Sequence, residues 1–175
     1  FYGIIKAMSP LPVCIRLLDP PLHEFLPSRE ELMVEIVEMK HKQVSLREIA
    51  EKEELLKKVN KLHEANPMLG HRGCRLGITY PEIYIMQVRA IFQAMVQLHQ
   101  EGCKNYVEIE IPLVMDQAEF LLLKDHILEV YASIKQENNV ELDFALGTML
   151  ELPRACVMAD EIAQQAEFFS FGTND

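Results

Sequence analysis

Short apolar runs alternate with longer stretches of helical periodicity along this chain. Four runs have the length and composition of buried β-strands: residues 11–17, 107–111, 142–147 and 168–171. Around them, apolar residues recur at three- and four-residue spacing, which predicts helices near residues 1–8, 29–42, 46–64, 79–101, 117–136 and 162–166. Two of these helices begin with a capping box, Ser28–Glu31 and Ser45–Glu48. Strands that alternate with helices favour a parallel β/α architecture.

The last two strands place two acidic residues at one edge of the predicted sheet. Glu151 follows the run 142–147 and Asp175 follows the run 168–171, with a helical segment between the runs. Such a crossover makes the two strands parallel, so both carboxylates emerge at the same edge. At about 4 Å they would repel by about 4 kcal/mol with an effective dielectric constant of about 20, so one is protonated or a cation lies between them. Oxygen ligands at such an edge suit Mg²⁺, and the alternative is two solvated loop acids.

A glycine-rich segment, residues 66–77, adds basic groups. Arg72 and Arg75 lie among three glycines, whose small size lets a ligand approach the backbone closely. The spacing matches neither the dinucleotide-binding fingerprint nor the P-loop, and a glycine-rich loop with surface arginines is the alternative. In a (β/α)8 barrel, binding residues lie at the carboxyl ends of the strands. Two arginines facing two acids at these ends indicate a pocket for a small anionic ligand: Arg16, Arg72, Glu151 and Asp175.

Composition restricts the class of protein. The chain has 175 residues, 49% of them hydrophobic, which suffices for one structural unit with a sizeable core. A net charge of −10 argues against nucleic acid or an anionic membrane as a partner, and no apolar run approaches the roughly 18 residues that span a bilayer. Four cysteines without a C-x-x-C pair predict reduced thiols: Cys14, Cys74, Cys103 and Cys156. We therefore expect a soluble protein of a reducing compartment, the cytoplasm or an organelle.

Four long segments resemble one known family. Residues 12–27, 66–83, 147–155 and 159–175 are similar to the phosphoenolpyruvate-binding barrel of the pyruvate, phosphate dikinases. Phosphoenolpyruvate synthase and enzyme I of the sugar phosphotransferase system share that barrel, but Gly70–Leu76 resembles the dikinase version of the glycine-rich loop. The resemblance implies that the chain, residues 1–175, is an incomplete (β/α)8 TIM-barrel domain with about strands 3 to 7, hence about five strands.

The resemblance also implies a role for each matched site residue. Arg16 and Arg72 would bind the phosphoryl and carboxylate oxygens of phosphoenolpyruvate. Glu151 and Asp175 would hold Mg²⁺, and three residues would line the substrate beside them: Gly172, Thr173 and Asn174. A cation lowers the free energy of the pyruvate enolate, and the arginines neutralise the phosphoryl group that the enolate accepts from a phosphohistidine.

The implied reaction interconverts ATP, pyruvate and phosphate with AMP, phosphoenolpyruvate and diphosphate. Full-length family members are homodimers, and the partner of this segment would be the phosphohistidine domain of the same full-length chain. The resemblance assigns neither the phosphohistidine nor the acid/base cysteine of the family to any residue between Phe1 and Asp175. We therefore expect no catalytic residue within this segment, and we predict that the isolated segment is inactive.

Two residues depart from the family pattern. Glu110 lies in the run 107–111 at a position where the family is apolar. A carboxylate buried there needs a partner or a proton. Cys14 stands where threonine is expected, which is a milder change.

Two alternative functions stay open from the sequence. One is a phosphoenolpyruvate synthase-like enzyme, which uses water in place of phosphate as the co-substrate. The other is a non-catalytic truncated barrel that acts as an interaction module. The second alternative predicts that replacing Glu151 or Asp175 by alanine leaves the behaviour of the protein unchanged.

Overall fold

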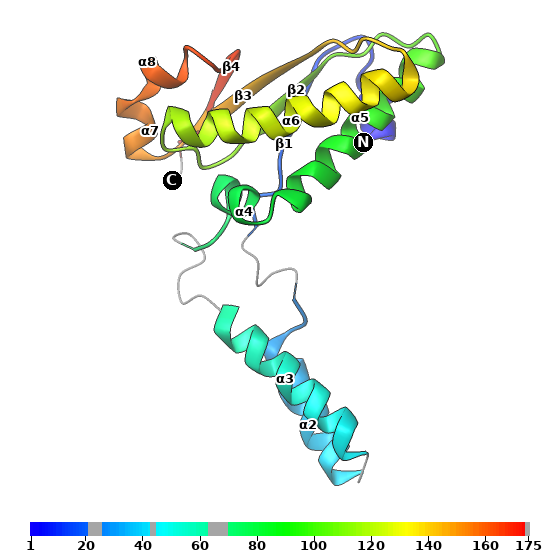
Figure 1. Ribbon diagram of the computed structural model, residues 1–175, viewed down its shortest axis with the longest axis vertical. Helices are drawn as coiled ribbons and strands as arrows, with labels where there is room; N and C mark the ends of the chain where they lie inside the picture. Colours follow the sequence, from blue (N-terminus) through cyan, green and yellow to red (C-terminus); the bar gives the residue numbers. More distant parts are fainter. Residues whose placement is uncertain (21–25, 43–44, 63–69, 174–175) are drawn as a thin grey trace. The chain divides into compact units, whose positions relative to one another are not determined.

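The computed structural model describes residues 1–20, 26–42, 45–62 and 70–173 (Figure 1). The described helices are α1 Tyr2–Met8, α2 Arg29–His41, α3 Leu46–Leu62, α4 Gly73–Thr79, α5 Pro81–Gln100, α6 Gln117–Asn138, α7 Pro153–Val157 and α8 Ala159–Ile162. The described strands are β1 Val13–Arg16, β2 Val107–Ile111, β3 Phe144–Leu150 and β4 Phe168–Phe171. All four predicted strands are therefore present, and the described residues form four strands instead of the five that the resemblance implied.

The chain divides into two compact units, although the composition predicted a single one. The first unit contains residues 1–19 and 72–175, and the second contains residues 20–71. All four strands belong to the first unit, and α2 and α3 form the second.

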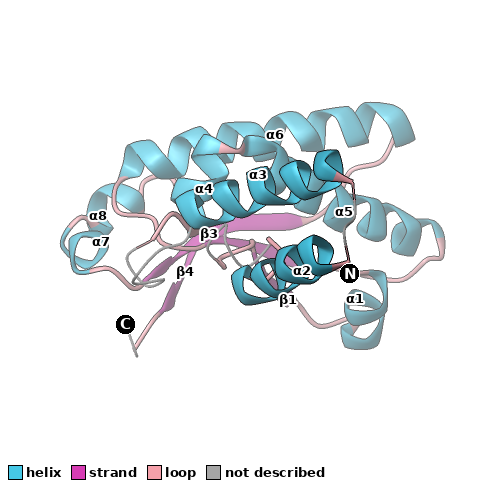
Figure 2. Ribbon diagram, turned by 90° about the horizontal axis from the view of Figure 1, so that it is seen from below, coloured by secondary structure: helices cyan, strands magenta, loops and turns pink. Residues whose placement is uncertain are grey.

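The four strands form one parallel sheet in the order β1-β2-β3-β4. The register aligns Arg16 with Glu110, Glu110 with Gly147, and Gly147 with Phe168. The sheet curls into a half-barrel, which confirms the predicted partial TIM barrel (Figure 2). Because the strands are parallel, the residues that follow each of them lie at the same edge.

Helices α5 and α6 cover one face of the sheet and enclose the hydrophobic core. In β2, side chains of Val107, Ile109 and Ile111 are fully buried in this core. Each such side chain contributes about 1.5–3 kcal/mol by its removal from water. The rings of Phe92, Tyr131 and Phe144 join α5, α6 and β3, since the Phe144 ring lies edge-on to both others at centroid distances of 4.9 Å. The apolar residues of α5 that face this core are buried, apart from Ile83, which is partly buried: Val88, Ile91, Phe92, Met95 and Val96.

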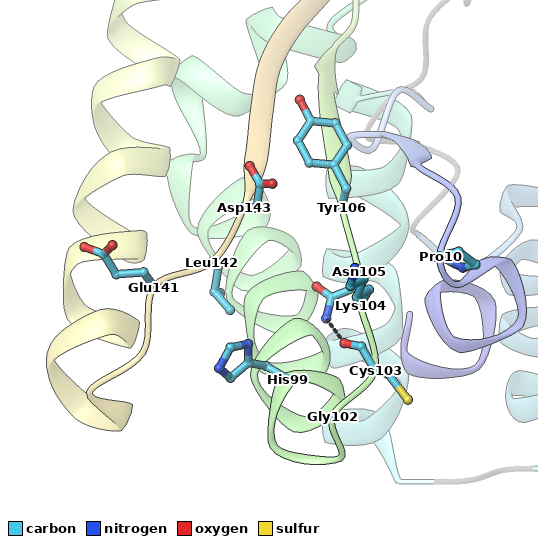
Figure 3. A pocket seen from close by; sticks show the side chains of 10 residues that line it. All are labelled: Pro10, His99, Gly102, Cys103, Lys104, Asn105, Tyr106, Glu141, Leu142 and Asp143. Atoms are coloured by element: carbon cyan, nitrogen blue, oxygen red, sulfur yellow. Dashed lines mark hydrogen bonds between the residues drawn. The ribbon is translucent and has the colours of Figure 1, made fainter.

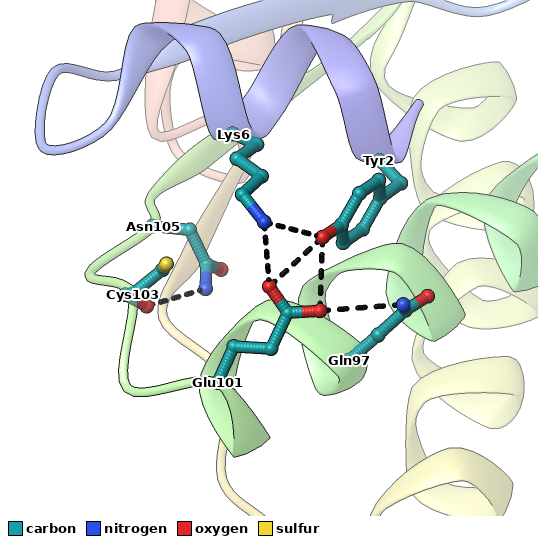
Figure 4. Close-up of polar contacts among 6 residues, drawn as sticks. All are labelled: Tyr2, Lys6, Gln97, Glu101, Cys103 and Asn105. Atoms are coloured by element: carbon teal, nitrogen blue, oxygen red, sulfur yellow. Dashed lines mark hydrogen bonds and ion pairs between the residues drawn. The ribbon is translucent and has the colours of Figure 1, made fainter.

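Polar side chains connect α1 to the carboxyl end of α5 (Figure 4). The Tyr2 hydroxyl donates to Glu101 at 2.8 Å, and the Lys6 ammonium donates to the same carboxylate at 2.9 Å. Gln97, one turn earlier in α5, donates to Glu101 at 3.3 Å. Helix α5 ends at Gln100, and Gly102, two residues later, has a φ of 75°, in the region that favours glycine.

Helices α2 and α3 of the second unit begin at the two predicted caps. The Ser28 hydroxyl oxygen accepts from the Glu31 amide at 3.3 Å, as a capping box requires. Ser45 instead accepts from the Arg47 amide, one residue earlier than the capping box predicts. Two exposed ion pairs connect the helices, Lys40 with Glu53 and Lys52 with Glu35.

The glycine-rich segment is more ordered than the predicted surface loop. Residues 66–69 lie outside the described part of the chain, but Gly73–Thr79 is helix α4, and four of its residues are buried: Gly73, Cys74, Leu76 and Gly77. A Cβ at Gly77 would lie 2.5 Å from the Tyr84 ring, so this glycine permits α4 to pack closely on α5. The glycines therefore serve helix packing here.

The connection between β3 and β4 differs from the single helix that the pattern predicted. Strand β3 continues to Leu150, and two short helices, α7 and α8, follow it. Pro153 begins α7 as its first residue, a position that tolerates proline because no backbone N–H is needed there.

The described helices include none that is both long enough and apolar enough to cross a membrane. The four cysteines are free thiols, as predicted.

Candidate functional site at the carboxyl ends of the strands

The described site residues lie where the strands end. Arg16 is the last residue of β1, and Arg72 immediately precedes α4. Glu151 directly follows β3, and Gly172 directly follows β4. The Gly172 amide donates to the Leu150 carbonyl at 3.0 Å, which continues the β3–β4 pairing to this edge. The structure thus brings one end of all four strands and these four residues to the same edge.

A buried carboxylate, that of Asp19, connects the two arginines. Asp19 is only 5% exposed. Its Oδ1 accepts from Nε of Arg72 at 3.1 Å, and its Oδ2 accepts from Nη2 of Arg72 at 2.5 Å. Nη1 of Arg16 lies 3.7 Å from the same Oδ2. The two arginines therefore converge on one acid that the sequence analysis did not single out.

Two polar residues of α5 fix the backbone between Arg16 and Asp19. The Tyr84 hydroxyl donates to the Leu18 carbonyl at 3.0 Å, and Gln87 accepts from the Leu18 amide at 2.8 Å. The Gln87 amide also donates to the Arg16 carbonyl at 3.2 Å. Sequence reasoning missed both residues, although polar groups three positions apart on an otherwise apolar helix face were a usable signal.

The Tyr84 hydroxyl stays protonated because burial raises its pKa. Cys74 and Asp19 raise this pKa further, Arg16 opposes them, and Glu151 adds to the increase. The hydroxyl is therefore available as a hydrogen-bond donor to the loop after β1 throughout the neutral pH range. The pKa of the Tyr84 hydroxyl is therefore influenced by Asp19 and Arg16, near the end of β1, and by Glu151, after β3.

Glu151 is positioned by the loop that follows β2. Its side chain is buried, and Oε1 accepts from the Leu113 amide at 2.7 Å. Leu113 has a φ of 61°, in the left-handed region that leucine rarely adopts. Close to it, Gly73 is necessarily a glycine, because a Cβ there would lie 2.8 Å from the Leu113 side chain. The Cys74 amide donates to the Pro112 carbonyl at 3.0 Å, so α4 is fixed to the same loop.

The sequence comparisons agree with this geometry. The profile of the family described as PEP-utilising enzyme, PEP-binding domain, where PEP is phosphoenolpyruvate, matches residues 1–175. The chain belongs to this PEP-binding family. It is 52% identical to the pyruvate, phosphate dikinase of Entamoeba histolytica, 49% to the chloroplastic pyruvate, phosphate dikinase of Mesembryanthemum crystallinum and 46% to the pyruvate, phosphate dikinase of Clostridium symbiosum.

These alignments include all of the chain but only part of each relative. The chain covers 20%, 18% and 19% of the three relatives, respectively. It therefore spans about a fifth of the length of the curated relatives it matches.

The predicted metal site lies partly outside the described residues. Asp175 and Asn174 are not described, whereas Glu151, Gly172 and Thr173 are. Within the described residues, no three His, Cys, Asp or Glu side chains gather as metal ligands. The donor chemistry at the strand ends still fits Mg²⁺, because Glu151 offers a buried carboxylate there. The metal pair of Glu151 and Asp175 stays a prediction.

Two thiols near the candidate site are poor acids. Burial raises the pKa of Cys74, and Glu119 raises it further. Burial and the neighbouring acids Glu110 and Glu108 raise the pKa of Cys14 to about 11. Both thiols are therefore protonated near neutral pH.

Glu110 is the buried acid that the sequence predicted would need a partner. It is 3% exposed, and its Oε1 lies 3.9 Å from the Cys14 thiol, which can donate to it. The two residues that depart from the family pattern therefore contact each other. A thiol is a weak donor, so this is a weak hydrogen bond.

A cavity of about 500 Å³ lies at the opposite, amino-terminal end of the strands (Figure 3). Its lining comes from the segments that precede β1, β2 and β3 and from the end of α5: Pro10, His99, Gly102, Cys103, Lys104, Asn105, Tyr106, Glu141, Leu142 and Asp143. None of the site residues predicted from the sequence belongs to this lining.

Proposed function

We propose that this chain binds PEP and pyruvate at the carboxyl ends of its strands, as the PEP/pyruvate-binding part of a pyruvate, phosphate dikinase. The observation that carries the proposal is the convergence of Arg16 and Arg72 on the buried carboxylate of Asp19, at the same sheet edge as Glu151. The family match and the names of the relatives support the same substrate.

The arginines perform the binding step in this proposal. PEP carries a phosphate and a carboxylate, and the planar guanidinium group matches both with paired hydrogen bonds. Arg16 is half exposed and Arg72 is largely buried, so Arg72 binds in the environment of lower dielectric, where its charge has the larger effect. Gly172, Thr173 and Asn174 then line the substrate at the end of β4.

Glu151 and Asp175 would hold Mg²⁺ beside the substrate. When bound, Mg²⁺ supplies a Lewis acid that stabilises negative charge on the pyruvate enolate oxygen. Glu151 is suited to this role because the Leu113 amide keeps its carboxylate in one orientation.

The complete proposed reaction converts pyruvate, ATP and phosphate reversibly into PEP, AMP and diphosphate. The phosphoryl group comes from a phosphohistidine domain of the same full-length chain, in a homodimeric enzyme of the cytoplasm or a plastid. The acid/base cysteine also comes from outside residues 1–175. The four described strands form an open sheet, so we expect the 175 residues alone to be inactive.

The proposal is tested by calorimetric titration of the protein, as its gene encodes it, with PEP in the presence of Mg²⁺. The wild-type chain is expected to bind PEP. Arg72→Met is expected to bind PEP at least about ten-fold more weakly, because the charge-assisted hydrogen bonds between Arg72 and PEP are lost. Arg89→Met is the matched control, since Arg89 pairs with Glu137 on the surface. No PEP binding by the wild-type protein would contradict the proposal and favour the interaction module.

A further inference from the structure

The Asp19 carboxylate has an unusual position for a charged group. It lies in the loop after β1, is almost fully buried, and contacts two arginines from different parts of the chain. A buried carboxylate is tolerated when it is paired and hydrogen-bonded, and both oxygens of Asp19 are. The acid therefore has a defined structural partner, Arg72, and a second, longer contact to Arg16.

The pairing with Arg72 is bidentate, and this fixes orientation. Nε and Nη2 lie on one edge of the guanidinium plane, and each donates to a different oxygen of Asp19. Two parallel bonds set both the position and the tilt of the plane, which a single bond does not. The Arg72 side chain is 15% exposed, so few other rotamers are accessible to it.

The backbone on both sides of the pair is fixed as well. The Gly73 amide donates to the Asp19 carbonyl at 3.3 Å, next to the side-chain pair. Tyr84 and Gln87 hold Leu18, the residue before Asp19. Arg72 follows Asp19 by 53 positions, and the intervening residues 20–71 form the second unit. Contacts with Asp19 thus determine where Arg72 lies relative to β1.

We propose that Asp19 is a positioning residue, whose carboxylate holds the Arg72 guanidinium, and through the shared oxygen also Arg16, in the orientation that receives the anionic substrate. The choice of PEP as that substrate rests on the proposed function. The arrangement of the arginines does not, so the two can be tested separately.

The first measurement concerns Arg72 alone and needs no ligand. In ¹⁵N–¹H spectra of the wild-type protein, the Nε–H signal of Arg72, identified by its absence in Arg72→Lys, is expected to be protected from solvent exchange. Asp19→Asn is expected to remove this protection, because an amide has one acceptor oxygen and places an NH₂ donor against the other guanidinium N–H. An unprotected signal in the wild-type protein overturns the proposal, whether or not the variant folds.

The second measurement concerns binding. With PEP and Mg²⁺, Asp19→Asn is expected to bind about ten-fold more weakly, and Asp19→Glu, which keeps the charge, to recover part of the affinity. In an Arg72→Lys background, Asp19→Asn is expected to have a much smaller effect, since the pairing with Arg72 is already lost and only the longer contact to Arg16 remains. Fully additive effects in this cycle would show a merely structural role and overturn the proposal.

Glu137→Gln is the matched control, because Glu137 also pairs with an arginine, Arg89, but on the surface. It is expected to leave both the Arg72 signal and the PEP affinity unchanged. If Arg72 loses protection in Asp19→Asn but neither protein binds PEP, the positioning role stands and the proposed function fails. If PEP binds equally to wild type and Asp19→Asn with Arg72 still protected, the positioning role fails and the proposed function stands.

Discussion

Polar side chains are arranged differently at the two ends of the sheet. At the carboxyl ends, four polar side chains are buried. Tyr84, Gln87 and Glu151 bond to the backbone of neighbouring loops, and Asp19 pairs with Arg72. At the amino-terminal end, Tyr2, Lys6 and Glu101 bond mainly to one another in partly or fully exposed positions. Burying a polar group costs free energy unless every bond is made, whereas exposed pairs contribute little. The end with the costly arrangement is therefore the better candidate for a binding site.

The cavity near the amino-terminal end shows why volume alone is a poor guide to function. It measures about 500 Å³, but its charged and titratable lining residues are exposed: His99, Lys104, Glu141 and Asp143. The strand ends opposite to it carry acids held in one orientation by backbone amides and arginines. Preorganised groups lose less entropy when they bind a ligand, so burial and bonding identify the site more reliably.

Replacing Glu151 has the largest expected effect. Glu151→Leu leaves the buried Leu113 amide without its acceptor, so the free energy of unfolding should fall by about 1–3 kcal/mol, and Mg²⁺-dependent PEP binding should be lost. Glu151→Gln keeps a neutral acceptor oxygen for the Leu113 amide, so the free energy of unfolding should fall by only about 1 kcal/mol. PEP binding should still be lost in this variant. Urea unfolding and calorimetry measure the two effects. PEP binding by Glu151→Gln with wild-type affinity would contradict the metal role.

Tyr84→Phe should have a smaller effect at the same end. The change removes the bond to the Leu18 carbonyl and keeps the ring that packs on Gly77, so the expected loss of stability is about 0.5–1.5 kcal/mol. Affinity for PEP should fall only a few-fold, because Gln87 still holds Leu18. Urea unfolding measures the loss. An unchanged free energy of unfolding in Tyr84→Phe would contradict the argument.

The regular elements could be predicted from the sequence because their signals are local. The strand 107–111 and the helix predicted over residues 79–101 follow directly from apolar spacing. The parallel sheet also followed, since a helix between two strands leaves little choice of direction. The prediction that Arg16 and Arg72 lie at one edge of the sheet was based only on that topology.

The contacts that orient the site could not be predicted in the same way. Asp19 and Arg72 are 53 positions apart with a second unit between them, and no spacing rule relates them. Leu113 adopts a left-handed backbone that its residue type does not suggest, and only this conformation presents its amide to Glu151. The glycines of α4 were predicted to lie in a loop. The close packing that requires a glycine at position 77 is not a local feature, because the Tyr84 ring lies in the next helix, α5.

Glu101→Gln tests the exposed end and should have the smallest effect. Hydrogen bonds from Lys6 and Tyr2 lower the pKa of Glu101 below its ordinary value of 4.5. A lowered folded-state pKa contributes stability that is present above pH 4.5 and is lost as the pH falls through the folded value. The small stability difference between wild type and Glu101→Gln, measured by urea unfolding, should therefore shrink toward acid pH. Gln97→Met removes a smaller contribution to the same lowered pKa, so its stability difference should shrink in the same direction but by less, and neither variant should change PEP affinity. A stability difference that grows with acidification would contradict the lowered pKa of Glu101. A loss of PEP binding in Glu101→Gln would show that the amino-terminal end is coupled to the candidate site.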